Sequence, residues 1–200
     1  MDTTRALPFV SPYLFAFWGV FIWAYVLEAI QHKRSEQRAA KHGGVDRYSG
    51  LVISIGSLVL QLLGFAVSFY APWQIPAEAL VPTFWIGLAL VVAGMLIRMH
   101  CWRVLGEFFT STVTIASEHK VVDTGAYRWL RHPSYFGAFL TFIGLGLTLG
   151  NYFCIASLVL GPLALYIYRI DVEEVALEAA LGQAYTEFKK TRKRFIPFVY

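Results

Sequence analysis

Residues 133–150, PSYFGAFLTFIGLGLTLG, and residues 152–170, YFCIASLVLGPLALYIYRI, are two apolar runs with Asn151 between them. Each run is close to the roughly 20 apolar residues that a helix needs to cross a bilayer. Because Gly150 and Asn151 favour a turn, the two runs are predicted to form a tight helical hairpin. This membrane hairpin decides the predicted fold class.

Three further apolar runs precede the hairpin, at residues 11–30, 50–70 and 83–102. The chain is 57% hydrophobic and 15% charged, whereas soluble domains carry about 25% charged residues. The sequence therefore predicts an all-α integral membrane protein with five transmembrane helices, folded as a single membrane domain over residues 1–200. The first run is expected to be a retained span and not a cleaved signal peptide, because only Arg5 gives it a basic flank.

Lysine and arginine residues concentrate at residues 31–49, at residues 103–132 and in the C-terminal tail, whereas residues 71–82 contain none. The positive-inside rule places the three basic segments in the cytosol and the N-terminus on the opposite side. The expected membrane is the endoplasmic reticulum in a eukaryote and the inner membrane in a bacterium. The tail after Asp171 is predicted to form a cytosolic amphipathic helix, with residues 195–200 returning to the interface.

The net charge of +4 does not indicate a nucleic-acid partner, because the basic residues flank apolar runs and suit anionic lipid headgroups. Two cysteines, Cys101 and Cys154, lie in or near apolar runs, and no disulfide framework is expected. No cluster of His, Cys, Asp and Glu has metal-ligand spacing, so no metal site is predicted. The polar stretch at residues 103–132 is too long for a simple connector, which favours a functional loop.

Two arginines fall within apolar runs, where an ionisable side chain is costly and needs a reason. Arg98 comes late in the third run, and Arg169 comes at the end of the fifth. If the fifth helix continues, Glu173 shares a face with Arg169, whereas Glu174 points about 100° away. Two interpretations stay open at this point. Either the arginines reach the interface and Arg169 forms a simple ion pair, or the group is a functional site.

The hairpin is preceded by R-W-L-R-H-P at residues 128–133, which puts three potential cations at the entrance to an apolar helix. Pro133 suits the first turn of that helix, and His132 suits its cap. With Arg128 and Arg131 nearby, the helix N-terminus could hold a carboxylate or phosphate. The alternative is a basic interfacial collar that only anchors the helix.

These motifs form an ordered set. It comprises HKVVDTGAYRWLRHPSYFG at residues 119–137, the hairpin, E-E-x-x-L at 173–177, G-x-x-Y at 182–185 and R-F-I-P-F at 194–198. The set, within a catalytic region of about residues 94–198, resembles the isoprenylcysteine carboxyl methyltransferase family of membrane enzymes. The resemblance implies S-adenosylmethionine as cofactor and methyl transfer to the carboxylate of a lipophilic substrate, above all a prenylated cysteine.

The resemblance also implies roles for individual residues. The cytosolic loop and the R-H-P motif would bind the cofactor through His119, Lys120, Val121, Val122, Tyr127, His132, Pro133, Ser134, Tyr135 and Glu174. Glu173 would meet the amino-acid end of the cofactor, and Arg169 would hold the substrate carboxylate, with Arg98 as a second catalytic and substrate-binding arginine. Eukaryotic members often carry a glutamine where this chain has Thr112, and no contact is assigned to Thr112.

Two other functions fit the same residues. A sibling enzyme could use this site on a phospholipid amine or a small thiol. An amine acceptor calls for a nearby base or carboxylate, so Arg169 favours a carboxylate acceptor. A non-catalytic membrane scaffold or small transporter would use the charges only as anchors, and it would not bind S-adenosylmethionine.

Overall fold

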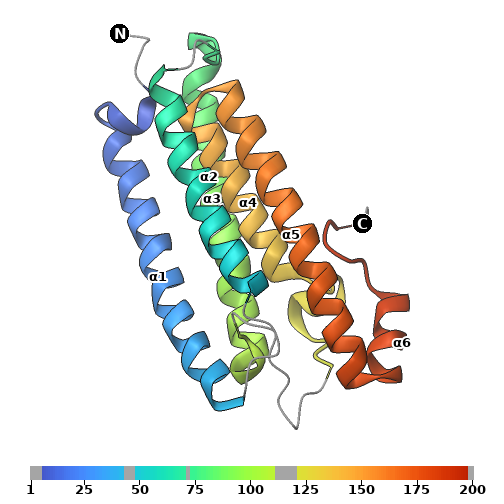
Figure 1. The fold of residues 1–200 in the computed structure, drawn as a ribbon. Helices are drawn as coiled ribbons and strands as arrows, with labels where there is room; N and C mark the ends of the chain where they lie inside the picture. The colour runs from blue at the N-terminus through green and yellow to red at the C-terminus, as the bar shows by residue number, and fades with distance from the viewer. Residues whose placement is uncertain (1–5, 43–47, 71–72, 111–120, 198–200) are drawn as a thin grey trace.

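The computed structural model describes residues 6–42, 48–70, 73–110 and 121–197. Within these ranges the regular elements are helices, and the long ones run side by side in an elongated bundle (Figure 1). They are α1 (Tyr13–His42), α2 (Tyr48–Tyr70), α3 (Ala77–Leu105), α4 (Pro133–Leu149), α5 (Tyr152–Leu181) and α6 (Gln183–Thr191), with short 3-10 turns at Leu7–Phe9, Gly106–Phe108 and Gly125–Arg128. The predicted all-α class is confirmed.

Among the described helices, α1, α2, α3 and α5 are long and apolar enough to cross a membrane. The 17 residues of α4 span only about 26 Å, slightly less than the roughly 30 Å of a hydrocarbon core. This helix packs against both α3 and α5. The chain is an integral membrane protein, and the crossing by α4 that would make five spans stays a prediction.

Two of the helices extend well beyond the predicted apolar runs. The first run was expected to end at residue 30, but α1 continues to His42, and α5 continues from the fifth run to Leu181. The added turns are rich in Ala, Glu, Gln, Lys and Arg, which are good helix formers. The polar ends of α1 and α5 therefore continue the helices instead of beginning separate loops.

Glycines bring α3 and α4 into close contact. A Cβ added at Gly87 of α3 would lie 2.6 Å from the carbonyl oxygen of Gly144 in α4, and one added at Gly137 would lie 2.7 Å from that of Gly94. Side chains do not approach backbone atoms this closely, so this packing requires glycine at these positions. In each helix the two glycines are seven residues apart, which extends the close contact over about two turns.

The turn between α4 and α5 confirms the predicted hairpin. Gly150 has a left-handed backbone, with φ of 67°, which glycine adopts without steric cost. The side chain of Asn151 caps α5 by accepting hydrogen bonds from the backbone N–H groups of Phe153 and Cys154, at 2.9 and 3.2 Å. These contacts fix α4 and α5 as antiparallel neighbours.

The R-H-P segment opens α4 as predicted, with His132 at the N-cap and Pro133 as the first helical residue. A contact that the sequence did not predict lies beside it. The backbone N–H groups of Arg131 and His132 donate to the carbonyl oxygens of Lys193 and Arg194, at 2.8 and 3.1 Å. The segment after α6 therefore folds back along the entrance to α4.

The predicted return of residues 195–200 to the membrane interface stays a prediction, but Phe195 does not present its side chain to lipid. Its side chain is fully buried, with ring centroids 5.5 Å from Phe139 and 6.3 Å from Tyr166. The backbone pairing just before it directs the ring into the core, where it loses more apolar surface to packing than it would at an interface. Residues 198–200 lie outside the described ranges.

Candidate active site

A cavity of about 590 Å³ lies among the five long helices. Part of its wall is apolar and includes Phe17, Phe21, Leu58, Leu88 and Leu145. Another part is polar and includes Arg98, Ser134, Tyr135, Arg169, Glu173 and Tyr185. A cavity with both kinds of wall suits a ligand that has a hydrocarbon portion and a charged portion.

Arg169 is buried on α5 at this cavity. Its Nε donates to the hydroxyl of Tyr135 at 3.2 Å, and its Nη1 donates to the hydroxyl of Ser49, at the start of α2. Oε2 of Glu173 lies 4.0 Å from Nε, so the predicted shared face of Arg169 and Glu173 is confirmed. The arginine is thereby fixed by side chains from three helices.

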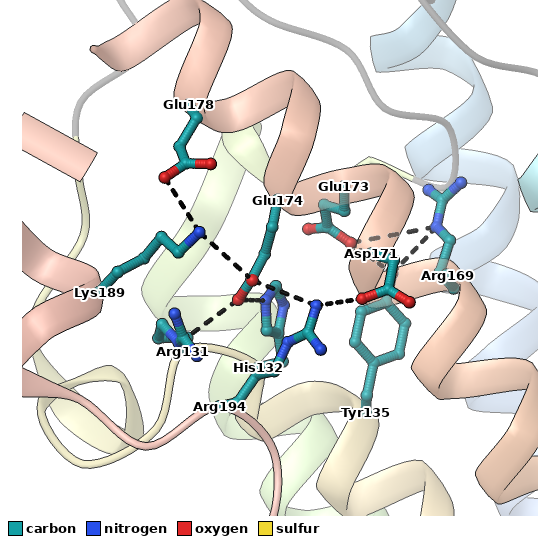
Figure 2. Close-up of polar contacts among 10 residues, drawn as sticks. All are labelled: Arg131, His132, Tyr135, Arg169, Asp171, Glu173, Glu174, Glu178, Lys189 and Arg194. Carbon is teal, nitrogen blue, oxygen red and sulfur yellow. Dashed lines mark hydrogen bonds and ion pairs between the residues drawn. The ribbon is translucent and has the colours of Figure 1, made fainter. Parts of the chain in front are cut away.

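Tyr135 connects Arg169 to Glu173 (Figure 2). Its hydroxyl accepts from Arg169 and donates to Oε2 of Glu173 at 2.7 Å. The first turn of α4 therefore orients both the predicted substrate arginine and the predicted cofactor carboxylate. About a quarter of the Glu173 side chain is exposed (27%), so the carboxylate can reach a ligand in the cavity.

Arg98 lies on α3 and borders the same cavity. Its Nη2 donates to Oε2 of Glu28 at 2.8 Å, and its Nε donates to Oε1 of the same carboxylate. Its Nη1 lies 3.2 Å from the carbonyl oxygen and 3.3 Å from Oγ of Ser134. The sequence reasoning missed Glu28, although an ionisable residue inside the first apolar run is the same signal that singled out the two arginines.

Glu174 points in a different direction from Glu173, as the predicted rotation of about 100° between neighbouring helical residues requires (Figure 2). Its carboxylate is buried. Oε1 lies 3.1 Å from Nε2 of His132 and 3.3 Å from Nε of Arg131, and Oε2 lies 3.2 Å from Nη2 of Arg194. Glu174 therefore joins α5 to the R-H-P segment and to the segment after α6, and a contact with cofactor stays a prediction.

The two arginines of the R-H-P segment have different surroundings. Arg131 contacts the buried Glu174, whereas Arg128 lies over the exposed ring of Trp129, at 5.4 Å from its centroid. The pair of Arg128 and Trp129 fits the predicted interfacial collar. Arg131 instead takes part in the buried network of ion pairs.

The other predicted cofactor residues divide into three groups. Val121, Val122, Tyr127, His132, Ser134 and Tyr135 line the cavity. Pro133 is fully buried at the start of α4. His119 and Lys120 lie outside the described residues, as does Thr112, to which no contact was assigned. Burial raises the pKa of Tyr127 well above its ordinary range, so its phenol stays a neutral hydrogen-bond donor at physiological pH.

Tyr185 on α6 is a further cavity residue to which the sequence reasoning gave no role. It is the tyrosine of the G-x-x-Y motif, and its buried hydroxyl has no hydrogen-bond partner within the described part of the chain. Burial raises its pKa, and the charges of Glu174 and Glu173 raise it further. A buried hydroxyl without a partner is unfavourable unless a ligand or water completes it, so Tyr185 fits a polar ligand beside Glu173.

Neither cysteine is in a disulfide, and both Cys101 and Cys154 are buried. Within the described ranges, no group of three or more His, Cys, Asp or Glu side chains is arranged to hold a metal ion.

The comparison with known proteins agrees with this geometry. Residues 85–179 match the model of the isoprenylcysteine carboxyl methyltransferase (ICMT) family. The resemblance predicted from the motifs is confirmed. The matched region contains Arg98, the R-H-P motif, Arg169 and Glu173, and it ends before the G-x-x-Y motif.

Individual proteins similar to this chain are named after the same activity as the family. The protein-S-isoprenylcysteine O-methyltransferase of Xenopus laevis is 34% identical over 116 residues, which are 57% of this chain and 40% of the relative. The Dictyostelium discoideum enzyme of that name is 28% identical over 144 residues, 70% of this chain and 61% of the relative. The chain thus matches about 40% to 60% of the length of these relatives.

The fold also matches a solved structure, that of the eukaryotic intramembrane Ras methyltransferase ICMT. The TM-score is 0.63 with 25% sequence identity, and the alignment covers 96% of this chain and 70% of the other. The structural likeness therefore extends beyond the region that the family model matches and includes α1 and α2.

Proposed function

We propose that this chain is an S-adenosylmethionine-dependent methyltransferase that acts on the carboxylate of a lipophilic substrate, above all a prenylated cysteine. The observation that carries the proposal is the arrangement of Arg169, Tyr135 and Glu173 at a cavity whose remaining wall is apolar. The family match over residues 85–179 supports it.

The residues at the cavity fit the proposed cofactor. Glu173 offers a carboxylate for an ammonium group, and no described residue supplies a hydrogen-bond partner to the buried hydroxyl of Tyr185. Val121 and Val122 provide apolar surface on the same cavity. When bound, S-adenosylmethionine would supply a sulfonium methyl group, whose carbon a carboxylate oxygen can attack in line as the bond to sulfur breaks and S-adenosylhomocysteine leaves.

Arg169 is proposed to hold the substrate carboxylate. A carboxylate is ionised at neutral pH and needs no general base, so the residues need only orient and desolvate it. The guanidinium can donate to an oxygen of the substrate carboxylate and leave a lone pair free for attack on the methyl carbon. Tyr135 and Ser49 fix the position of the guanidinium. The apolar wall, including Leu58 and Leu145, would receive the hydrocarbon tail and exclude water.

The proposal is tested by offering labelled cofactor to a panel of acceptors: a farnesylated cysteine, a phospholipid amine and a lipophilic thiol. Methyl transfer to the farnesylated cysteine alone, as a base-labile ester, is expected. Transfer to the amine or the thiol instead would show that the acceptor is not a carboxylate. A purified protein that binds no S-adenosylhomocysteine and labels none of the three would show the scaffold or transporter function instead.

The proposed arrangement in the membrane follows from the same function. We infer one membrane domain with five spans, in which residues 31–49, residues 103–132 and the C-terminus face the cytosol, where the polar cofactor is present. The basic end of α1, the entrance to α4 and α6 lie at the same end of the bundle, which supports this orientation (Figure 1). Protease accessibility of tags in the first two segments, in sealed vesicles, tests it.

A further inference from the structure

Glu28 and Arg98 form a two-point ion pair between α1 and α3. Arg98 uses Nη2 and Nε for the two carboxylate oxygens of Glu28, and Nη1 for Ser134 in the first turn of α4. Ser134 directly precedes Tyr135, which contacts Arg169. Ser134 and Tyr135 therefore connect the ion pair of Glu28 and Arg98 to Arg169, the proposed substrate-binding residue.

The face of α1 that carries Glu28 forms part of the cavity wall. Glu28, Gln31 and Ser35 all border the cavity, and their spacing of three and four residues puts them on one side of the helix. Nε2 of Gln31 and Oγ of Ser35 are buried and find no hydrogen-bond partner among the described residues. This polar face is directed into the cavity, so Glu28 belongs to the site and not to the lipid-facing surface.

A fork between an arginine and a carboxylate is also the contact that a substrate carboxylate would make. Three arginines border the cavity: Arg98 pairs with Glu28, Arg131 pairs with Glu174, and Arg169 lies 4.0 Å from Glu173. Loss of the Glu28 charge would make this largely apolar cavity more positive by one unit, and charges interact strongly where water is scarce. The site would then attract a carboxylate ligand more strongly.

We propose that Glu28 is an internal carboxylate ligand of Arg98 that sets how tightly the site holds the substrate carboxylate. This inference rests on the proposed function. With Arg98 occupied by Glu28, the substrate is held by Arg169, and its oxygen keeps the electron density that methyl transfer requires. A carboxylate held by both arginines would be more stable in the ground state and would react more slowly. Glu28, which lies outside the family region at 85–179, is thus a positioning residue.

The test is Glu28→Gln, measured with the farnesylated cysteine and with two inhibitors, a farnesyl thioether acid and its primary amide. The affinity for the acid is expected to rise at least about tenfold relative to that for the amide, a change of the size expected for a charged hydrogen bond. The KM for the farnesylated cysteine should fall, and kcat should fall with it. A purely structural role of Glu28 would change acid and amide binding equally.

A matched control is Glu36→Gln, the same change two turns later on α1, at an exposed residue 3.4 Å from His32. The ratio of its affinities for the acid and the amide inhibitors (the acid-to-amide ratio) should equal that of the unmodified protein. The double variant Glu28→Gln with Arg98→Gln removes both charges and should restore the original ratio. If Glu28→Gln fails to fold, Glu28→Asp keeps the charge but shortens its reach, and an intermediate rise is expected.

Two results are distinguishable. An unchanged or lower acid-to-amide ratio in a Glu28 variant that still binds S-adenosylhomocysteine would overturn the role of Glu28. Failure of the unmodified protein to methylate any acceptor would instead contradict the proposed function, whatever the variants do.

Discussion

Arg169 and Arg98 border the same cavity but have different partners. Arg98 is engaged by both oxygens of Glu28, with Nη2 at 2.8 Å from Oε2. Arg169 contacts two hydroxyl groups, and the carboxylate of Glu173 lies further away, at 4.0 Å. Arg98 therefore has both oxygens of one carboxylate as direct partners, whereas the contacts of Arg169 with Tyr135 and Ser49 fix its position at the cavity wall.

Substitution of Arg169 by alanine is expected to reduce methyl transfer at least about a hundredfold, the scale seen when a key polar group is removed from an active site. The protein should still insert in membranes and bind the cofactor product. Turnover with labelled cofactor in detergent is the measurement. Arg128→Ala, at the exposed pair with Trp129, should change turnover less than twofold. Near-normal activity of the Arg169 variant would rule out its substrate role.

The Glu173→Gln variant is expected to bind S-adenosylhomocysteine about tenfold or more weakly, because a charged hydrogen bond to the ligand's ammonium becomes a neutral one. Its unfolding temperature should change little, since Glu173 is partly exposed. Calorimetric titration gives the affinity, with Glu178→Gln on the same helix as the control. Equal affinities in the Glu173 variant and the unmodified protein would contradict this assignment.

At the scale of the element, α4 determines the geometry of the site. Its first turn carries Ser134 and Tyr135, which contact Arg98 and Arg169. The position of that turn depends on the glycine contacts with α3 and on the hairpin to α5. A small shift of α4 would therefore disturb both arginines together.

Gly94→Ala is expected to destabilise the protein by about 1–3 kcal/mol, the usual effect of overpacking a tight contact. The new methyl group would meet the backbone carbonyl oxygen of Gly137 in α4, which cannot rotate away as the end of a side chain can. Gly19→Ala on α1 is the control, because a Cβ there meets nothing within 4 Å. Thermal unfolding in detergent compares the two variants, and a stable Gly94 variant with full activity would show that α4 can shift without loss.

At the scale of the whole molecule, a network of ion pairs closes the bundle around Glu174 (Figure 2). It joins α5 to α6 through Lys189, which lies 3.8 Å from Glu174 and 3.0 Å from Glu178. It reaches the C-terminal segment through Arg194, which also contacts Asp171. The chain beyond the apolar runs is thereby held against the entrance to α4.

Glu174→Gln is expected to destabilise the folded protein by about 3–5 kcal/mol, since removal of one partner from a buried ion pair leaves the other charges uncompensated. Thermal unfolding measures this effect. Glu187→Gln is the control, because its pair with Lys190 is exposed on α6. Cofactor titration of the folded fraction separates the two roles: reduced affinity there would show the direct cofactor contact predicted for Glu174, and unchanged affinity would leave only the structural one.

Local features of the chain could be predicted from the sequence because they depend on neighbours. The apolar runs indicated the helices, Gly150 and Asn151 the hairpin turn, and the four-residue spacing the approach of Arg169 to Glu173. The start of α4 at Pro133 followed from the missing N–H of proline. These features arise within one helix or one turn.

Contacts between distant segments were decided only by the tertiary structure. Glu28 and Arg98 are separated by 70 positions, and Ser49 and Arg169 by 120. The burial of Phe195 likewise depends on backbone pairing with the R-H-P segment. An apolar run indicates that a helix can cross the membrane, but not which of its faces meets which neighbouring helix. The sequence by itself therefore determined the helices and the kinds of charged residue at the site, whereas the packing of α1, α4 and the C-terminal segment determined which charge meets which.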